Sequence, residues 1–349
     1  MTSFNLEPKV NHLHILKNTI PKLQFDNGNV KAWQTKLRKK VKQCLGYDKM
    51  PKDLCNLNVR SLWKKEHELG TIEKIVFTSE PKADVTAYLC LPKNIKAPYN
   101  CMITLQGHNS GVHWAINVDR EDESKAFIPV EDGDRDFGLQ CMRNGLAGLC
   151  IEQRSFGERK QNSENNPTMC HAASMHAIML GKTLVAERVY DVDRGIDYLS
   201  TLGNINMKAI GIMGNSGGGT TSMFAAAILP RISLASPGSY FCSFADSIFS
   251  VGHCTCNYIP DLINYAEMSD IMGLFAPKPV IIVNGKEDDI FPIKATRKQF
   301  KLLQNIYDKA KAKDHSHLVV GNGGHRYYAD QAWPLILKEF NHINHSIKK

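Results

Sequence analysis

The sequence predicts an α/β fold in which helices flank a mostly parallel central sheet, with a helical extension at the N-terminus. Short apolar runs without alternation recur along the chain and are separated by segments of helical period. Strands buried on both faces have this composition, because helices cover both faces of a parallel sheet. No such run occurs near the N-terminus, so we expect a helical extension over residues 1–68 and one large domain over 69–349.

The extension contains one clear amphipathic helix. Trp33, Leu37, Val41 and Leu45 recur every four residues, and mainly basic residues fill the positions between them. Gly46 follows as a helix stop. We expect this helix to pack on the main domain and not to form a separate binding module.

The main domain is expected to alternate strands and helices. The predicted strands are 71–78, 85–91, 101–105, 145–151, 209–213, 280–283 and 317–320, and the predicted helices are 175–199, 220–228, 293–307 and 329–343.

Composition excludes several classes of function. The net charge is +8, but the lysines are scattered and no nucleic-acid motif accompanies them, so we expect no nucleic-acid partner. No apolar run reaches the roughly 18 residues of a membrane span, and the first residues lack a secretory signal. The ten cysteines are mostly single and often lie in apolar runs. We therefore expect free thiols and a cytoplasmic location.

A serine stands on a glycine-rich turn at residues 214–218, Gly-Asn-Ser-Gly-Gly. An apolar strand leads in and an alanine-rich helix leads out, which is the arrangement of the nucleophile elbow in the α/β-hydrolase fold. Larger side chains at Gly214 or Gly218 would collide with neighbouring backbone. A phosphate-binding loop is the alternative, but the Lys-Ser or Lys-Thr pair that it needs is missing. We predict that Ser216 is the nucleophile.

The general base and its acid should follow later strands in the chain order Ser, acid, His. His325 lies in a glycine-rich loop after the last predicted strand, whereas the other late histidines lie in a strand, on the last helix or in an earlier loop. Asp288 stands three residues after Gly285, the usual position of the acid, and Asp289 is the alternative. We predict a triad of Ser216, His325 and Asp288.

The negatively charged tetrahedral intermediate needs two backbone N–H donors. One is expected from Gly217, directly after the nucleophile, and the other from His108, in the loop after strand 101–105.

Residues 253–256, His-Cys-Thr-Cys, resemble a fragment of a metal or redox site. The segment lacks the second pair of ligands that a zinc site needs, so a structural role is favoured. His171 and His176 are five residues apart, which does not suit two ligands on one helix face. We therefore predict neither a metal nor a cofactor.

Several motifs together resemble the dienelactone hydrolase and acetyl xylan esterase branch of the α/β-hydrolases, including its uncharacterised bacterial esterase-like members. The resemblance covers roughly residues 30–345 and rests on segments 105–108, 153–158, 181–184, 188–191, 214–219, 253–260, 284–292 and 324–325. Dienelactone hydrolases use a cysteine nucleophile, so Ser216 points to ester hydrolysis. Arg154 matches an arginine of the sugar deacetylases, but Ser155 replaces the glycine that follows it there, so a structural role is at least equally favoured.

The expected function is hydrolysis of a carboxylic ester of a small molecule, as in carboxylesterases and deacetylases, through an acyl-enzyme on Ser216. An amidase, peptidase or acyltransferase could use the same triad, and a binding module without catalysis could use the same fold. The sequence is compatible with a homo-oligomer and does not identify the ester.

Overall fold

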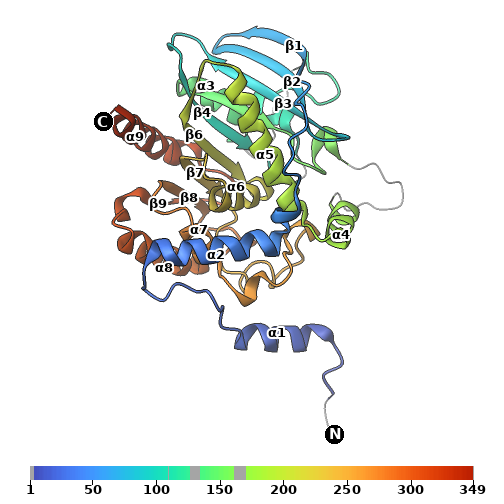
Figure 1. Cartoon of the computed structure of the whole chain (residues 1–349), viewed down its shortest axis with the longest axis vertical. Helices are drawn as coiled ribbons and strands as arrows, with labels where there is room; N and C mark the ends of the chain where they lie inside the picture. The colour runs from blue at the N-terminus through green and yellow to red at the C-terminus, as the bar shows by residue number, and fades with distance from the viewer. Residues whose placement is uncertain (1–3, 109, 126–133, 161–169, 349) are drawn as a thin grey trace.

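A computed structural model describes residues 4–108, 110–125, 134–160 and 170–348 of the chain. Its centre is a twisted nine-stranded sheet with the strand order β1-β2-β3-β5-β4-β6-β7-β8-β9 (Figure 1). The strands are β1 (Arg60–His67), β2 (Gly70–Glu80), β3 (Ala83–Pro92), β4 (Tyr99–Leu105), β5 (Ala147–Ile151), β6 (Ile205–Asn215), β7 (Leu234–Gly238), β8 (Val280–Gly285) and β9 (Ser316–Gly321).

The sheet is parallel from β5 to β9 and antiparallel at one edge. Strands β1, β2 and β3 form an antiparallel meander, and β3 pairs antiparallel with β5. The remaining neighbours all pair in parallel. The predicted mostly parallel sheet is therefore confirmed, and the carboxyl ends of β4, β6, β8 and β9 meet at the same edge, where ligands of such sheets bind.

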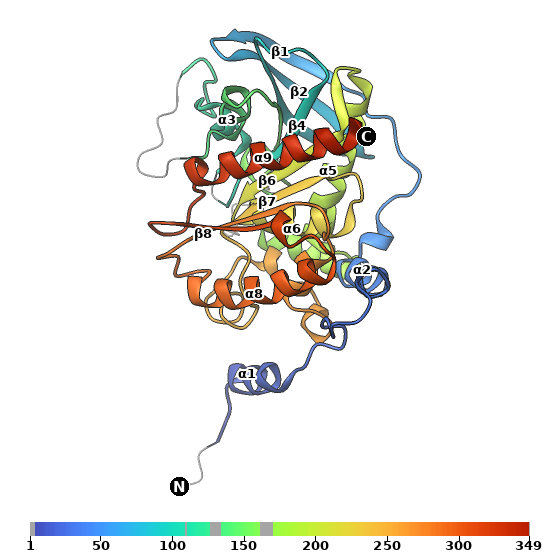
Figure 2. The ribbon, with the colours of Figure 1, turned by 90° about the vertical axis from the view of Figure 1, so that its left-hand side faces the viewer.

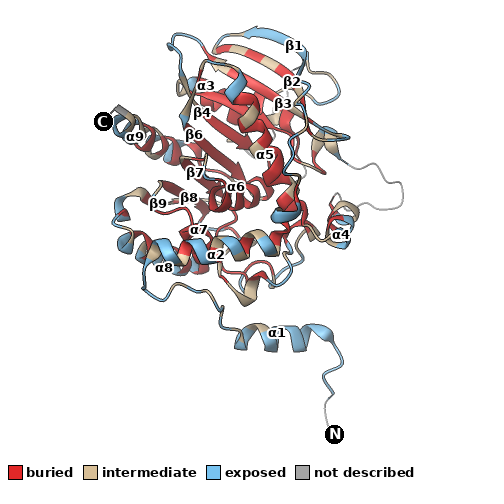
Figure 3. Cartoon of the chain, in the orientation of Figure 1, coloured by how far each residue is buried: buried red, intermediate tan, exposed pale blue. Residues whose placement is uncertain are grey.

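Helices cover both faces of the sheet (Figure 2). Apolar side chains of α2, α5, α6, α7 and α8 join one core cluster, whereas α3 and α9 pack on the other face. Figure 3 shows the central strands buried between these layers. The helices are α1 (Pro8–Asn18), α2 (Val30–Leu45), α3 (Phe137–Arg143), α4 (His171–Met179), α5 (Leu184–Thr201), α6 (Gly217–Ile228), α7 (Met268–Gly273), α8 (Ile293–Lys309) and α9 (Ala329–Lys348).

The extension differs in part from its prediction. In α2, Leu37, Val41 and Leu45 are buried, and the helix ends at Gly46 in the left-handed conformation, as predicted. By contrast α1 has no buried residue and stands away from the main body in Figures 1 and 2. Strand β1 lies within the range 1–68 and pairs with β2, so the sheet begins earlier than the predicted boundary. Strand β1 was not predicted because most of its residues are exposed, so it contains no apolar run.

The predicted helix over 175–199 is divided in two. Gly181 has a φ of +73° between α4 and α5, and the Thr183 side chain caps the N-terminus of α5 by accepting from the Ala186 N–H. Strand β7 and the short helices α3 and α7 were not predicted, because five to seven residues carry little periodic signal. None of the described helices has the length and apolar character needed to cross a membrane.

Candidate active site

Ser216 occupies the sharp turn between β6 and α6. Its backbone has φ 73° and ψ −108°, an unfavourable conformation for a residue with a side chain. The Ser216 N–H donates to the carbonyl oxygen of Gly238, at the end of the neighbouring strand β7, at 2.9 Å. The turn is thereby held at the carboxyl edge of the sheet, with the serine directly before the first turn of a helix.

Two glycines allow the backbone to approach this closely. A Cβ atom at Gly218 would lie 2.0 Å from the carbonyl oxygen of Leu105 in β4. A Cβ atom at Gly214 would lie 2.6 Å from the backbone carbon of Gly218. Both distances are far inside van der Waals contact. A side chain at either position would therefore collide with neighbouring backbone, as expected from the sequence.

The structure brings together the three residues predicted as a triad. The Nε2 atom of His325, in the loop after β9, lies 2.8 Å from Oγ of Ser216. The Nδ1 atom of the same ring lies 2.9 Å from Oδ2 of Asp288, which follows β8. The imidazole therefore bridges the hydroxyl and the carboxylate, the geometry needed to accept a proton from a serine.

Asp288, and not Asp289, faces the histidine. The Asp288 side chain is buried, and its Oδ1 atom accepts from the backbone N–H groups of Ile290 and Phe291 at 3.0 and 2.9 Å. Asp289 is exposed. Two other late histidines are occupied elsewhere, since His315 and His317 each lie 2.7 Å from a carboxylate oxygen of Glu339.

The two residues predicted as backbone donors lie side by side at the turn. A Cβ atom at Gly217 would come within 2.8 Å of the His108 ring, and one at Gly107 would lie 3.3 Å from Cβ of Ser216. The loop after β4 thus passes directly beside the serine. The buried Gln153 side chain supports this loop, a role the sequence did not indicate: it donates to the Gln106 carbonyl at 2.6 Å and accepts from the Thr221 hydroxyl at 2.6 Å.

A cavity of about 940 Å³ opens onto Ser216 and His325. This volume suits a small organic molecule. The other lining residues come from several loops and from α4 and α6: His108, Trp114, Arg135, His171, Thr220, Tyr240, 251–255, Asn257 and 289–291.

Two aromatic residues near the predicted triad were not assigned a role from sequence. The ring of Phe291 stacks on His325 with centroids 5.7 Å apart, and it also contacts His253, at 5.4 Å. Burial lowers the pKa of His253, and the neighbouring His108 and His325 lower it further. A neutral His253 therefore lines the cavity at neutral pH. Phe291 could have been suspected, because it stands three residues after Asp288.

Arg154 is a structural anchor. Its guanidinium binds both carboxylate oxygens of Asp191, at 2.9 and 2.8 Å, and one oxygen of Glu80 at 2.5 Å. These carboxylates raise the pKa of Arg154 despite its burial. The side chain is thus fully engaged within the protein, and it is not among the cavity-lining residues.

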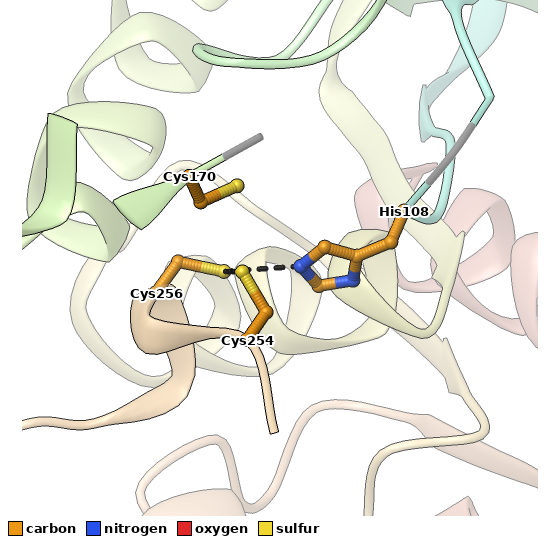
Figure 4. Close-up of side chains that lie close together, drawn as sticks. All are labelled: His108, Cys170, Cys254 and Cys256. Atoms are coloured by element: carbon orange, nitrogen blue, oxygen red, sulfur yellow. Dashed lines mark hydrogen bonds between the residues drawn. The ribbon is translucent and has the colours of Figure 1, made fainter. Parts of the chain in front are cut away.

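The expectation that residues 253–256 lack a second pair of ligands is wrong. Cys254 and Cys256 do have further potential ligands, namely His108 and Cys170, which the fold brings beside them (Figure 4). These residues lie about 85 or more positions apart in sequence from the Cys-Thr-Cys segment, so ligand spacing along the chain could not identify the group.

The α/β-hydrolases are defined by a mostly parallel sheet that presents a serine on a strained strand-to-helix turn. The loops after later strands supply a histidine and a carboxylate. The chain has this fold, as the sequence predicted. Residues 181–345 match the prolyl oligopeptidase family. The chain is also 24% identical over 275 residues to "Putative hydrolase YtaP" of Bacillus subtilis (strain 168), a match that spans 77% of this chain and 87% of the relative.

Solved structures of esterases share the fold. A "putative acetyl xylan esterase" from Bacteroides fragilis superposes with a TM-score of 0.73 and 16% identity, covering 91% of this chain and 83% of the other. A glucuronoyl esterase from Solibacter usitatus superposes with a TM-score of 0.65 and 15% identity, covering 93% of this chain and 97% of the other. Acetyl xylan esterase 1 from Thermoanaerobacterium superposes with a TM-score of 0.57 and 14% identity, covering 96% of this chain and 99% of the other. The esterase-like branch that the motifs resembled is thus also the branch that the fold resembles.

Proposed function

We propose that this protein is a serine hydrolase that cleaves a carboxylic ester of a small molecule. The observation that carries the proposal is the line of contacts from Ser216 Oγ to His325 Nε2, at 2.8 Å, and from His325 Nδ1 to Asp288, at 2.9 Å. The names of the esterases with the same fold support an ester as the substrate.

The chemistry follows from these contacts. His325 Nε2 accepts the hydroxyl proton while Oγ of Ser216 attacks the acyl carbon. Asp288 accepts a hydrogen bond from Nδ1–H, which holds the ring in the correct tautomer and stabilises the imidazolium. The imidazolium then gives its proton to the leaving alcohol, and water hydrolyses the acyl-enzyme with the same histidine as base.

The oxyanion of each tetrahedral intermediate would accept from the backbone N–H groups of Gly217 and His108. Both residues adjoin the serine, and Gly217 begins helix α6, whose N-terminal end carries partial positive charge. Loss of one such donor typically costs on the order of a hundredfold or more in turnover.

The cavity favours a substrate of limited size. Its volume of about 940 Å³ exceeds what an acetyl group needs and leaves room for a sugar or a comparable alcohol portion. None of the ten cysteines, all of which lie in the described residues, forms a disulfide, which supports a reducing compartment such as the cytoplasm. Small acetylated metabolites fit these features better than a polymer outside the cell.

Peptide hydrolysis is the second candidate, because residues 181–345 match a family named for oligopeptidases. The test is a panel of p-nitrophenyl acetate, acetylated sugars, lactones and a prolyl peptide amide, each with wild type and Ser216→Ala. Serine-dependent turnover of the esters well above that of the amide is expected. Faster turnover of the amide would replace the ester proposal. A protein that neither turns over any of these compounds nor reacts with a fluorophosphonate would be a binding module.

A further inference from the structure

Four side chains with metal-binding atoms meet beside the active-site cavity: His108, Cys170, Cys254 and Cys256 (Figure 4). Their ligand atoms all lie within 4.8 Å of one another. The Nε2 atom of His108 lies 3.1 Å from Sγ of Cys256, which in turn lies 3.4 Å from Sγ of Cys254. All four side chains therefore point toward one small volume.

These separations are close to those of a tetrahedral zinc site. With Zn–S bonds of about 2.3 Å and Zn–N bonds of about 2.0 Å, neighbouring ligand atoms stand roughly 3.5–3.8 Å apart. The four ligand atoms would each need to move by less than the length of a Zn–S bond to reach such an arrangement. Cys170 and Cys256 are buried, so the site is shielded from solvent on that side.

A buried cation marks the same place. Arg188 is only 1% exposed, and its Nη2 atom lies 3.3 Å from Sγ of Cys170. Its other partners are the Arg154 carbonyl and the face of the Phe156 ring, and it forms no ion pair with any carboxylate of the described residues. A buried guanidinium needs a negative partner. A zinc ion with three thiolates and a neutral imidazole carries one net negative charge and would provide that partner.

We propose that His108, Cys170, Cys254 and Cys256 bind one zinc ion. With four protein ligands the coordination shell is closed, which is typical of a structural zinc site and not of a catalytic one. Binding replaces the protons of the three thiols, which pass to solvent, and involves no change in oxidation state. The ion therefore takes no part in the ester chemistry.

The site would fasten three distant segments around the cavity. His108 follows β4, Cys170 directly precedes α4, and Cys254 and Cys256 belong to the cavity-lining loop near residue 255. Coordination by Nε2 would also fix the His108 ring, which lies against Gly217. The zinc ion would thus hold the wall of the cavity in place, and metal binding would contribute directly to folding stability.

The test is the metal content of the full-length protein, purified without a histidine tag and under reducing conditions. We expect inductively coupled plasma mass spectrometry to find about one zinc per chain. Cys254→Ser and Cys170→Ser should each lower this content at least severalfold. Cys55→Ser, as exposed as Cys254, and Cys141→Ala, as buried as Cys170, should retain it.

Two further measurements keep the proposal testable if a ligand variant does not fold. Wild-type protein reconstituted with Co²⁺ should show thiolate charge-transfer bands and the intense visible bands of tetrahedral cobalt. Ser216→Ala should bind zinc as wild type does while losing esterase activity, so failure of the proposed function and failure of the metal site remain distinguishable. Wild-type protein without stoichiometric zinc, zinc unaffected by both ligand variants, octahedral cobalt spectra, or a disulfide among these cysteines in freshly isolated protein would each overturn the proposal.

Discussion

Oδ2 of Asp288 lies 2.9 Å from Nδ1 of His325, on a carboxylate with no solvent-exposed surface. The other carboxylate oxygen is held by two backbone N–H groups, so the orientation of Asp288 is fixed by the loop itself. This arrangement gives the two neighbouring aspartates different environments and therefore different expected roles.

Replacing Asp288 should damage catalysis far more than replacing Asp289. Asp288→Asn would present an amide to Nδ1 and favour the wrong imidazole tautomer, and we expect kcat on p-nitrophenyl acetate to fall about 10⁴-fold. Asp289→Asn serves as the matched control and should stay within a few-fold of wild type, because this side chain is exposed. A severe loss for Asp289→Asn alone would transfer the role of the acid to that residue.

Ser216→Ala should abolish ester hydrolysis without unfolding the protein. We expect kcat to fall by at least about 10⁴-fold, since the attacking oxygen is removed. Circular dichroism and the melting temperature should remain close to those of wild type. If Ser216→Ala hydrolysed the ester as fast as wild type, another group would be the nucleophile.

Gly218→Ala should prevent the strand-to-helix turn from forming. The new methyl group would meet the Leu105 carbonyl oxygen at 2.0 Å, so either β4 or α6 must move. We expect a loss of folded protein or a melting temperature lowered by many degrees. Gly252→Ala is the control, since its Cβ would meet nothing within 4 Å. Equal melting temperatures for the two variants would contradict the close approach.

Arg154→Met should reduce stability but not the chemistry of the folded enzyme. It leaves the buried carboxylate of Asp191 with Arg159 as its remaining partner and the partly buried carboxylate of Glu80 without this one, and breaking a buried ion pair costs at most about 3–5 kcal/mol. Chemical denaturation measures this loss, with Arg120→Met as control, because the Arg120–Glu121 pair is exposed and worth at most about 1 kcal/mol. Loss of substrate affinity with unchanged stability would instead make Arg154 a substrate-binding residue.

Stability should decrease as the pH rises from about 4.5 to about 7. Burial raises the pKa of Glu152 to about 7, so the folded state retains a proton that the unfolded state has already released. The stabilising contribution is fully present below the unfolded pKa and is lost as the pH rises through the folded pKa, with a limiting slope of about 1.4 kcal/mol per pH unit.

Glu152→Gln should reduce this slope, measured as the free energy of unfolding in urea at several pH values. A residual slope is expected, because burial also raises the pKa of Glu267 to about 7 and that of Asp270 to about 6. Glu121→Gln, at an exposed position, serves as the control. An unchanged slope in Glu152→Gln would show that Glu152 is ionised in the folded protein.

The sequence determined the fold class and the identity of the residues at the turn. Ser216 is flanked by a strand and a helix that are both strongly apolar, and local sequence carries such information directly. The order of Asp288 and His325 along the chain, each after a buried strand, was enough to select them as partners of the serine. Parallel strands bring their carboxyl ends to one edge, so residues after different strands meet there.

Only the tertiary structure decided which neighbours share a small volume. The spacing from Gly285 favoured Asp288 and left Asp289 as the alternative, and the directions of the two side chains within the loop place Asp288 against His325. The saturation of Arg154 by carboxylates depends on β2 and α5 packing against its loop. The meeting of His108 and Cys170 with Cys254 and Cys256 depends on three loops folding over one edge of the sheet. Contacts between segments far apart in the chain leave no periodic pattern in a single sequence, and for that physical reason they appear only in the folded molecule.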